Sequence, residues 1–387
     1  MAIFASANKK TQNPHQMSHP VQHIPFDIAE QFIKAALQAY RVPADDAAIV
    51  ADVLVTADKF GFDSHGSNRL KPIYLDRIRD GILEAVTNVE IVRQGPTTAV
   101  IDGHNGLGHV IGRQAMQLAV DKARDFGMGM VAVRNSTHYG IAGYYALMAA
   151  RQGMIGITGT NARPSVAPTF GVENLLGTNP MTFAMPTDEE FPFLLDCATS
   201  IAQRGKIELY ARENKPLQQG WVVDKNGNSK TDSREVLQDL VAGDAALCPL
   251  GGIGEESGGY KGYGYATVVE ILSAALQNGA YLRMLMGIEN GKKVPYPLGH
   301  FFMAIDVSAF TEESEFRKTT GNILRELRAS RRMPGQDRIY TAGEKEFLTW
   351  KERKDKGIPF TPKLKEEFAQ LSRDLNLQEY LQYFAQK

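Results

Sequence analysis

The sequence lacks the cysteines that a disulfide framework would need. It has two, Cys197 and Cys248, which lie far apart and show no CxxC spacing. One pair of cysteines cannot form a disulfide framework for a chain of 387 residues. A structural zinc site or a redox pair needs closer spacing. The composition therefore favours a reducing compartment.

The chain also lacks an excess of either charge and any long apolar run. Its 43 Lys and Arg residues against 44 Asp and Glu residues give a net charge of -1, which provides no field to attract a polyanion or an acidic membrane. No apolar run approaches the roughly 20 residues that span a bilayer, and no signal-peptide pattern opens the chain. We expect a soluble, cytoplasmic protein that binds neither nucleic acid nor a membrane.

The length of the chain predicts more than one lobe, because single cores rarely grow this large. Residues 1–22 are polar and predict a flexible tail, with a metal site formed by His15, His19 and His23 as the alternative. We further predict a helical N-terminal lobe (23–95), an α/β region of one or two discontinuous lobes (96–310), and a helical C-terminal segment that packs on the N-terminal lobe (311–387).

Apolar residues at helical spacing predict a helical hairpin over residues 26–60. In the DSHGSNRL segment that follows, His65 and Arg69 are four positions apart and share a face if a helix begins at Ser64 or Gly66. An imidazole exchanges a proton, and a guanidinium binds a carboxylate through two parallel hydrogen bonds. The alternative is that Ser64 caps a helix and His65 is a solvated turn residue.

Strands and helices alternate in the middle of the chain. TTAVIDG, GMGMVAVRN and MIGITGTN have the pattern of strands, with helices over roughly 110–126 and 141–152 between them. This alternation predicts a parallel sheet covered by helices, with chemistry in the loops that follow the strands.

The first of these loops tests for an ordinary dinucleotide fold. Residues 103–108 have the spacing GxxGxG rather than GxGxxG, and the second strand ends in Arg134-Asn135-Ser136 with no acidic residue to hold a ribose. We therefore exclude an ordinary Rossmann site and interpret these glycines as turn formers.

Two further strand ends carry candidate proton-transfer residues. His138 lies in STHYG, beside hydroxyl groups and followed by small residues, a pattern that suits either a ligand site or a helix cap. Asp196 ends the apolar strand in FPFLLD, where it could orient a histidine or accept backbone N–H bonds at the turn.

Several polar and glycine-rich segments could bind a ligand. Asn161 follows the third strand, and LLGTNP contains Gly177, Thr178 and Asn179, although Asn-Pro turns also form without ligands. GGYKGYG leads into a helix whose free N–H groups and Lys261 would form an anion site, with a purely structural glycine turn as the alternative.

Six segments, in order over about residues 26–350, resemble the malate/L-lactate dehydrogenase family of NAD(P)-dependent 2-oxoacid reductases. They are DSHGSNRL, STHYGIAGYYALMA, LLGTNPMTFAMP, LLDCATSIAQRGKI, GGYKGYGYATVVEILSAAL and GHFFMAID. The family also includes ureidoglycolate and sulfolactate dehydrogenases and is distinct from the Rossmann-type lactate dehydrogenases. The resemblance implies an α/β fold with an unusual non-Rossmann NAD(P)-binding fold and a helical lobe, a homodimer, and NAD or NADP as cofactor.

Position by position, the resemblance implies roles for individual residues. His65 matches the histidine of the SHG motif and Arg69 the arginine four residues later, which looks like the substrate-carboxylate clamp. His138 matches a histidine proposed in some members as the acid/base, and Asp196 matches the aspartate before the ATS segment. No metal ligand is implied. The positions that match the surroundings of the cofactor are Ser136, Asn161, Gly177, Thr178, Asn179, Lys206, Gly259, Lys261 and Gly262.

The resulting hypothesis is hydride transfer between NAD(P) and a 2-hydroxy or 2-oxo acid, with malate and oxaloacetate first. Lactate, sulfolactate, ureidoglycolate and cyclic imino acids are alternative substrates. We favour His65 over His138 for proton transfer, because Arg69 ties it to the substrate end. The rival hypotheses are a metal-dependent hydrolase or lyase that uses His65, His138 and Asp196 as ligands, although HExxH spacing is absent, and a nucleotide-binding scaffold.

Overall fold

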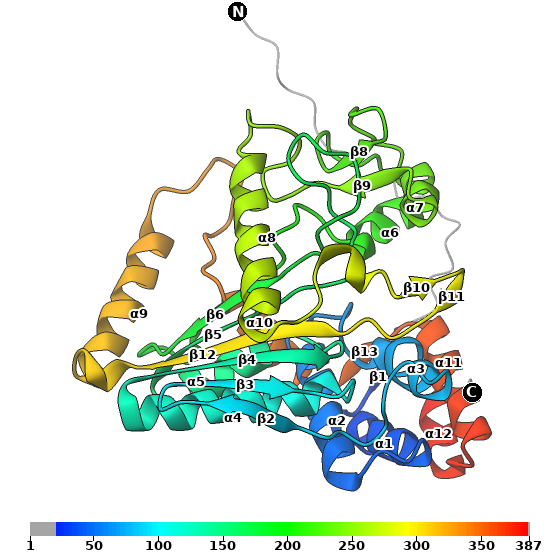
Figure 1. Cartoon of the computed structure of the whole chain (residues 1–387), viewed down its shortest axis with the longest axis horizontal. Helices are drawn as coiled ribbons and strands as arrows, with labels where there is room; N and C mark the ends of the chain where they lie inside the picture. The colour runs from blue at the N-terminus through cyan, green and yellow to red at the C-terminus, as the bar shows by residue number, and fades with distance from the viewer. Residues whose placement is uncertain (1–20, 386–387) are drawn as a thin grey trace, which may run out of the picture.

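The computed structural model describes residues 21–385 (Figure 1). The predictions about His15 and His19 lie outside this range. His23 belongs to strand β1 (Gln22–Ile24), which pairs antiparallel with β13 (Ile358–Phe360). The predicted tail, expected to include residue 22, therefore overlaps the first strand by one residue.

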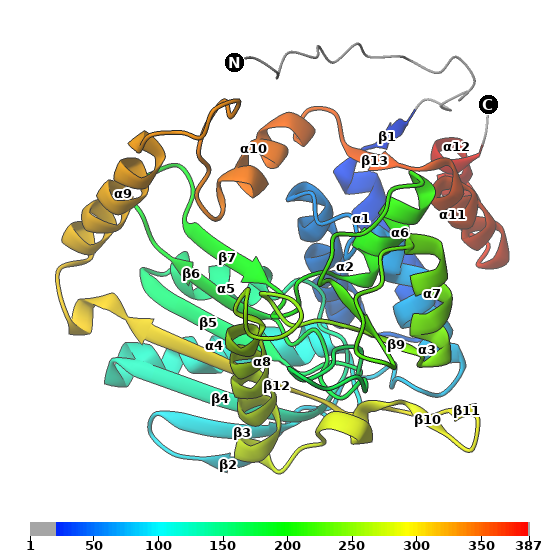
Figure 2. The same ribbon diagram turned by 90° about the horizontal axis from the view of Figure 1, so that it is seen from above.

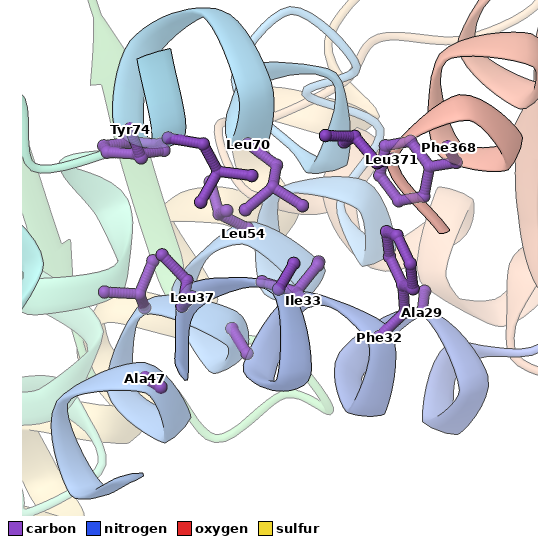
Figure 3. Packing of buried hydrophobic residues seen from close by; sticks show 14 of the residues in the cluster. Ala29, Phe32, Ile33, Leu37, Ala47, Leu54, Leu70, Tyr74, Phe368 and Leu371 are labelled. Carbon is purple, nitrogen blue, oxygen red and sulfur yellow. The ribbon is translucent and has the colours of Figure 1, made fainter. Parts of the chain in front are cut away.

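The predicted helical hairpin is present as α1 (Phe26–Ala39) and α2 (Ala44–Lys59), with Pro43 as the N-cap of α2. The hairpin shares one core with α11 (Pro362–Asp374) and α12 (Leu381–Phe384). Phe32, Phe368 and Phe384 are fully buried there, with ring centroids 4.9 to 5.3 Å apart. Figure 3 shows Phe32 of α1 facing Phe368 of α11 and Ile33 of α1 facing Leu70. Each buried phenylalanine contributes about 1.5–3 kcal/mol, so the two ends of the chain stabilise one helical lobe.

A seven-stranded sheet forms the centre of the molecule, in the order β2–β3–β4–β12–β5–β6–β7. The predicted parallel sheet was wrong: β3 and β4 pair parallel, but β12 inserts antiparallel between β4 and β5, and the remaining pairs are antiparallel. The strands are β2 (Glu90–Gln94), β3 (Thr98–Asp102), β4 (Met128–Ser136), β5 (Met154–Thr160), β6 (Met181–Met185), β7 (Phe193–Cys197) and β12 (Leu298–Asp306).

Helices cover both faces of this sheet. The two predicted helices are present as α4 (Gly108–Phe126) and α5 (Gly143–Ala150) on one face, and α8 (Gly259–Ala274) crosses the opposite face (Figure 1). Buried Ile111, Ala115 and Ala119 recur along α4 every four residues and so share one face of the helix. Gly127 ends α4 in the left-handed conformation, with φ of 82°.

A smaller region stands above the sheet in Figure 1 and has its own core around Val222, Val236 and Leu247. It contains α6 (Arg204–Arg212), β8 (Val222–Asp224), α7 (Ser233–Ala242) and β9 (Ala245–Leu247). The hairpin of β10 (Ile288–Glu289) and β11 (Lys292–Lys293) precedes β12. No helix within residues 21–385 has the length and apolar character that a membrane crossing requires.

The segments that surround the site complete the fold. A 3₁₀ turn (Ser67–Arg69) and a π-helical turn (Leu70–Leu75) lead from α2 into the short α3 (Asp76–Arg79). Beyond the sheet, α9 (Glu313–Ala329) precedes α10 (Glu344–Arg353), which lies between α9 and the β1–β13 pair in Figure 2. The division into units at 23–95, 96–310 and 311–387 stays a prediction.

Candidate active site

A cavity of about 230 Å³ lies where the segment after α2 meets the loop after β4 and the end of β7. Its lining includes His65, Arg69, Thr178, Asp196 and Arg204. Segments far apart in the sequence thus place an imidazole, two guanidinium groups and a carboxyl group around one small space. This combination suits the binding and proton transfer of a small organic acid.

His65 and Arg69 belong to this cavity, although no α-helix begins at Ser64 or Gly66. The chain instead turns there, and Arg69 Nε donates to the Ser64 carbonyl oxygen. The Ser64 hydroxyl lies 2.8 Å from His65 Nδ1. Burial, helped by the charge of Arg69, lowers the pKa of His65 to about 4, so the ring is neutral at neutral pH.

His138 lies next to His65, with the two ring centroids 5.8 Å apart and the ring planes 19° from parallel. Its Nδ1 receives two donors: the Tyr74 hydroxyl at 2.7 Å and the Gly140 backbone N–H at 3.3 Å. Two donors at Nδ1 make that nitrogen the acceptor and place the proton of the neutral ring on Nε2. Burial, with a smaller contribution from His65, holds the pKa of His138 well below its ordinary value.

Asp196 lines the cavity but hydrogen-bonds to neither histidine. Its carboxylate accepts the Gly143 backbone N–H at 2.7 Å and the Thr182 hydroxyl at 2.9 Å. Of its two predicted roles, the structure thus supports acceptance of a backbone N–H, here at the start of α5. Burial raises the pKa of Asp196, because few groups around it compensate a buried negative charge.

Three residues that were predicted to surround the cofactor direct their side chains into the interior. The Ser136 hydroxyl lies 2.8 Å from His300 Nε2. Asn161 donates to the Ala280 carbonyl oxygen at 3.0 Å and accepts the Gly299 N–H at 2.9 Å. Asn179 donates to Glu270 Oε2 at 2.7 Å. All three are fully buried, whereas the neighbouring Thr178 keeps an exposed face in the cavity.

The predicted glycines allow backbone segments to pack closely. A Cβ at Gly177, Gly259 or Gly262 would collide with the carbonyl group of Ala162, Gly252 or Leu250, respectively. This contact supports the structural alternative for these glycines and leaves the anion site at α8 as a prediction. Lys261 is exposed in the first turn of α8, and Lys206 places its ammonium group 4.8 Å from the centre of the Trp221 ring.

The cavity and the start of α8 belong to one continuous set of loops. Ile201 donates to the Cys248 carbonyl oxygen at 3.0 Å, and Leu250 donates to that of Thr199 at 2.8 Å. The loop after β7 therefore lies against the glycine-rich loop that packs on α8. A helix start with an exposed lysine, next to a cavity with polar walls, fits an elongated anionic cofactor.

Sequence reasoning missed Tyr74, Thr182 and Arg204. Tyr74 lies in the π-helical turn, a rare conformation that often marks functional sites. No local sequence pattern predicted this turn. Thr182 and Arg204 reach the site only because strand pairing and the β7–α6 connection bring them there.

The described residues give no support to a metal-dependent hydrolase. Among residues 21–385, no three His, Cys, Asp or Glu side chains are grouped closely enough to hold a metal ion. Comparison with known proteins distinguishes the two remaining hypotheses, a 2-hydroxy acid dehydrogenase and a nucleotide-binding scaffold.

A profile described as "Malate/L-lactate dehydrogenase" matches residues 24–369. The chain belongs to the malate/L-lactate dehydrogenase family. It is 44% identical to malate dehydrogenase from Pyrococcus horikoshii over 355 residues, which cover 92% of this chain and 96% of that protein. It is 37% identical to L-sulfolactate dehydrogenase from Methanocaldococcus jannaschii, with 91% and 98% of the two chains covered.

A solved structure of this family has the same fold. Malate dehydrogenase from Entamoeba histolytica superposes with a TM-score of 0.89 at 43% identity, over 92% of this chain and 99% of that one. The chain is therefore an oxidoreductase of the CH–OH group of 2-hydroxy acids that uses a nicotinamide cofactor, on a mixed α/β fold. Family membership excludes both the hydrolase and the scaffold hypotheses.

Proposed function

We propose that this member of the malate/L-lactate dehydrogenase family interconverts malate and oxaloacetate in the cavity lined by His65 and Arg69. The observation that carries the proposal is the presence of two guanidinium groups, Arg69 and Arg204, around one 230 Å³ cavity. Malate has a carboxylate at each end, and two cations on separate elements suit two carboxylates. The malate dehydrogenases among its relatives, at 43 and 44% identity, support the same substrate.

Arg69 binds the C1 carboxylate and Arg204 the C4 carboxylate in this proposal. Arg69 is partly buried and held by the Ser64 carbonyl group, so its fork is pre-oriented for one geometry. Arg204 is more exposed, with 54% of its side chain accessible, and pairs with Glu208 at 3.0 Å. The same arrangement suits the sulfonate of sulfolactate, which is therefore the second candidate substrate.

His65 takes the hydroxyl proton during oxidation and returns it during reduction. If Nδ1–H donates to the Ser64 hydroxyl, Nε2 is the unprotonated nitrogen, and the lowered pKa keeps the ring neutral. His138, whose proton is on Nε2, donates a hydrogen bond to the substrate oxygen. Its neutral ring stabilises the oxygen without competing for the proton.

The cofactor in this proposal spans from the cavity to the start of α8. Lys261 and the first backbone N–H groups of α8 bind the phosphates, while Thr178 belongs to the cavity wall and Lys206 lies on α6, two residues after Arg204 of that wall. When bound, the nicotinamide supplies the hydride acceptor for C2 oxidation and the hydride donor for the reverse reaction. Ser136, Asn161 and Asn179 support this surface from the interior through the bonds described above.

A panel of 2-oxo acids, assayed with NADH and NADPH in parallel, tests the proposal. Oxaloacetate should give the highest kcat/KM, with sulfopyruvate next and pyruvate well below both. A preference for pyruvate, or for a cyclic imino acid, would contradict the assignment of Arg204. The same panel determines whether NAD or NADP is the cofactor.

We further propose that the protein is a cytoplasmic homodimer. Tyr265, Val268 and Ile271 recur every three residues on α8 and are 46 to 54% exposed, so one face of this helix is apolar and accessible. A second copy of the chain that buries this face would form a C2 interface. Both cysteines are free thiols, which supports a reducing compartment.

A further inference from the structure

The His65 loop, which comprises residues 61–67, is held from one side by a buried carboxylate. Asp58, near the end of α2, is 4% exposed, and its Oδ2 accepts the Ser67 backbone N–H at 2.9 Å and also the Ser67 hydroxyl. A Cβ at Gly66 would collide with the same carboxylate. Asp58 therefore contacts both residues that follow His65.

The other side of the loop is held by the last residue of α10. The Arg353 guanidinium binds Asp63 with two parallel bonds, from Nη1 to Oδ1 at 2.6 Å and from Nη2 to Oδ2 at 3.0 Å. Nη1 also donates to the Asp58 carbonyl oxygen at 2.6 Å. Bidentate pairing fixes orientation as well as distance, so a single side chain joins the residues before His65 to the end of α2.

Helix α10 is well placed for this contact. It packs against α2, and its Thr349 methyl group fills the space next to Gly61, which has φ of 81°. In Figure 2, α10 lies on the path that returns the chain from α9 to the N-terminal lobe. The Arg353 side chain is only 15% exposed, whereas its partner Asp63 is 59% exposed. The guanidinium is thus fixed by the fold, and the loop is the element that it holds.

We propose that Asp58 and Arg353 are positioning residues that hold the His65 loop in its substrate-binding shape, Asp58 through Ser67 and Arg353 through Asp63. The inference rests on the proposed roles of His65 and Arg69. A loop that is ordered before the substrate arrives loses less entropy on binding and keeps the imidazole and guanidinium in register. The C-terminal helix α10 is by this account a part of the active-site scaffold.

Three variants test the proposal: Arg353→Met, Asp58→Asn and Asp63→Asn. Hydrogen exchange of the full-length protein should accelerate about tenfold in peptides that cover residues 61–69, with no change in α4. The KM for oxaloacetate should rise about tenfold, while the Kd for the reduced cofactor, measured by its fluorescence, stays within a factor of two. Arg353→Lys, which keeps the charge and one bond, should recover part of both effects.

Lys351→Met is the matched control. Lys351 lies on the same helix and pairs with Glu190 at 2.6 Å, away from the loop. This variant should leave the KM and the exchange at 61–69 unchanged. Because Asp63 is exposed, Asp63→Asn folds even if the buried variants do not.

The outcomes distinguish failure of the positioning role from failure of the proposed roles of His65 and Arg69. Wild-type exchange and KM in both Asp63→Asn and Arg353→Met would overturn the proposed positioning role of Arg353. Faster exchange at residues 61–69 with an unchanged KM would support the positioning role. It would overturn the assignment of His65 and Arg69 to substrate binding. A fall in kcat that accompanies an equal loss of cofactor binding would show general damage and would also overturn the positioning role.

Discussion

The Tyr74 hydroxyl oxygen lies 2.7 Å from Nδ1 of His138, and the Tyr74 side chain is fully buried. This relationship selects one tautomer of His138, because the hydroxyl and the Gly140 N–H both donate to Nδ1. His138 is therefore a hydrogen-bond donor through Nε2. The division of labour between the two histidines follows from this contact.

Tyr74→Phe should lower kcat about tenfold, because only the longer bond from the Gly140 N–H, at 3.3 Å, then favours the Nε2-protonated tautomer of His138. The free energy of unfolding should change by only about 1 kcal/mol, the value of one hydrogen bond. Steady-state kinetics and thermal denaturation measure the two effects. Tyr144→Phe, which removes a hydroxyl bonded to Asp52 at 2.6 Å, is the control and should keep its kcat.

His65→Asn should lower kcat by roughly 10²- to 10⁴-fold, the usual contribution of a general base, and more than His138→Asn does. Oxidation requires the neutral ring, and burial with Arg69 lowers the His65 pKa to about 4. The kcat/KM for malate oxidation should therefore stay level as pH falls from 8 to about 5 and drop only nearer pH 4. Reduction requires the protonated ring, so its kcat/KM should rise as pH falls. An acid limb at the ordinary histidine value of 6.5 would contradict the assignment.

Arg204→Gln should discriminate between substrates. The kcat/KM for oxaloacetate should fall about 10- to 100-fold, the value of one charge-assisted hydrogen bond to a carboxylate, while that for pyruvate stays nearly constant. The ratio of the two is the measurement. Arg212→Gln, on the same helix but away from the cavity, should leave the ratio unchanged.

Asp58 should make stability depend on pH. Burial raises its pKa to about 7, above the unfolded value near 4, so its stabilising effect is complete below pH 4 and is lost as pH rises through 7. Between pH 6 and pH 8 the wild-type protein should lose about 1.4 kcal/mol relative to Asp58→Asn, which has no charge to bury. Denaturation of both proteins at the two pH values measures this difference. Parallel pH responses would contradict it.

Val268→Glu should convert the proposed homodimer into a monomer, since a carboxylate in a buried apolar interface is costly. Light scattering coupled to size exclusion measures the mass. Val241→Glu is the control, because Val241 is 71% exposed on α7 rather than on the α8 face. A wild-type protein that is already monomeric would refute the dimer.

Periodicity within the sequence was enough to predict the α1–α2 hairpin, α4, α5 and β3 to β5, because each depends on contacts between near neighbours. The ordered motifs were also enough to identify the family, and they named His65, Arg69 and Asp196 before the cavity that joins them was known. The spacing of four between His65 and Arg69 pointed to a shared site for the wrong reason, since a turn, not an α-helix, brings them together.

Only the tertiary structure decided the direction of the sheet and the partners of the site residues. Strand β12 comes from residues 298–306 yet pairs with β4 and β5, and no local pattern encodes which strand inserts between two others. Likewise, Tyr74 meets His138 and Arg353 meets Asp63 across long stretches of chain. The physical reason is common to all three: hydrogen bonds between distant segments depend on how the whole chain packs, whereas periodicity reports only which face of each element is buried.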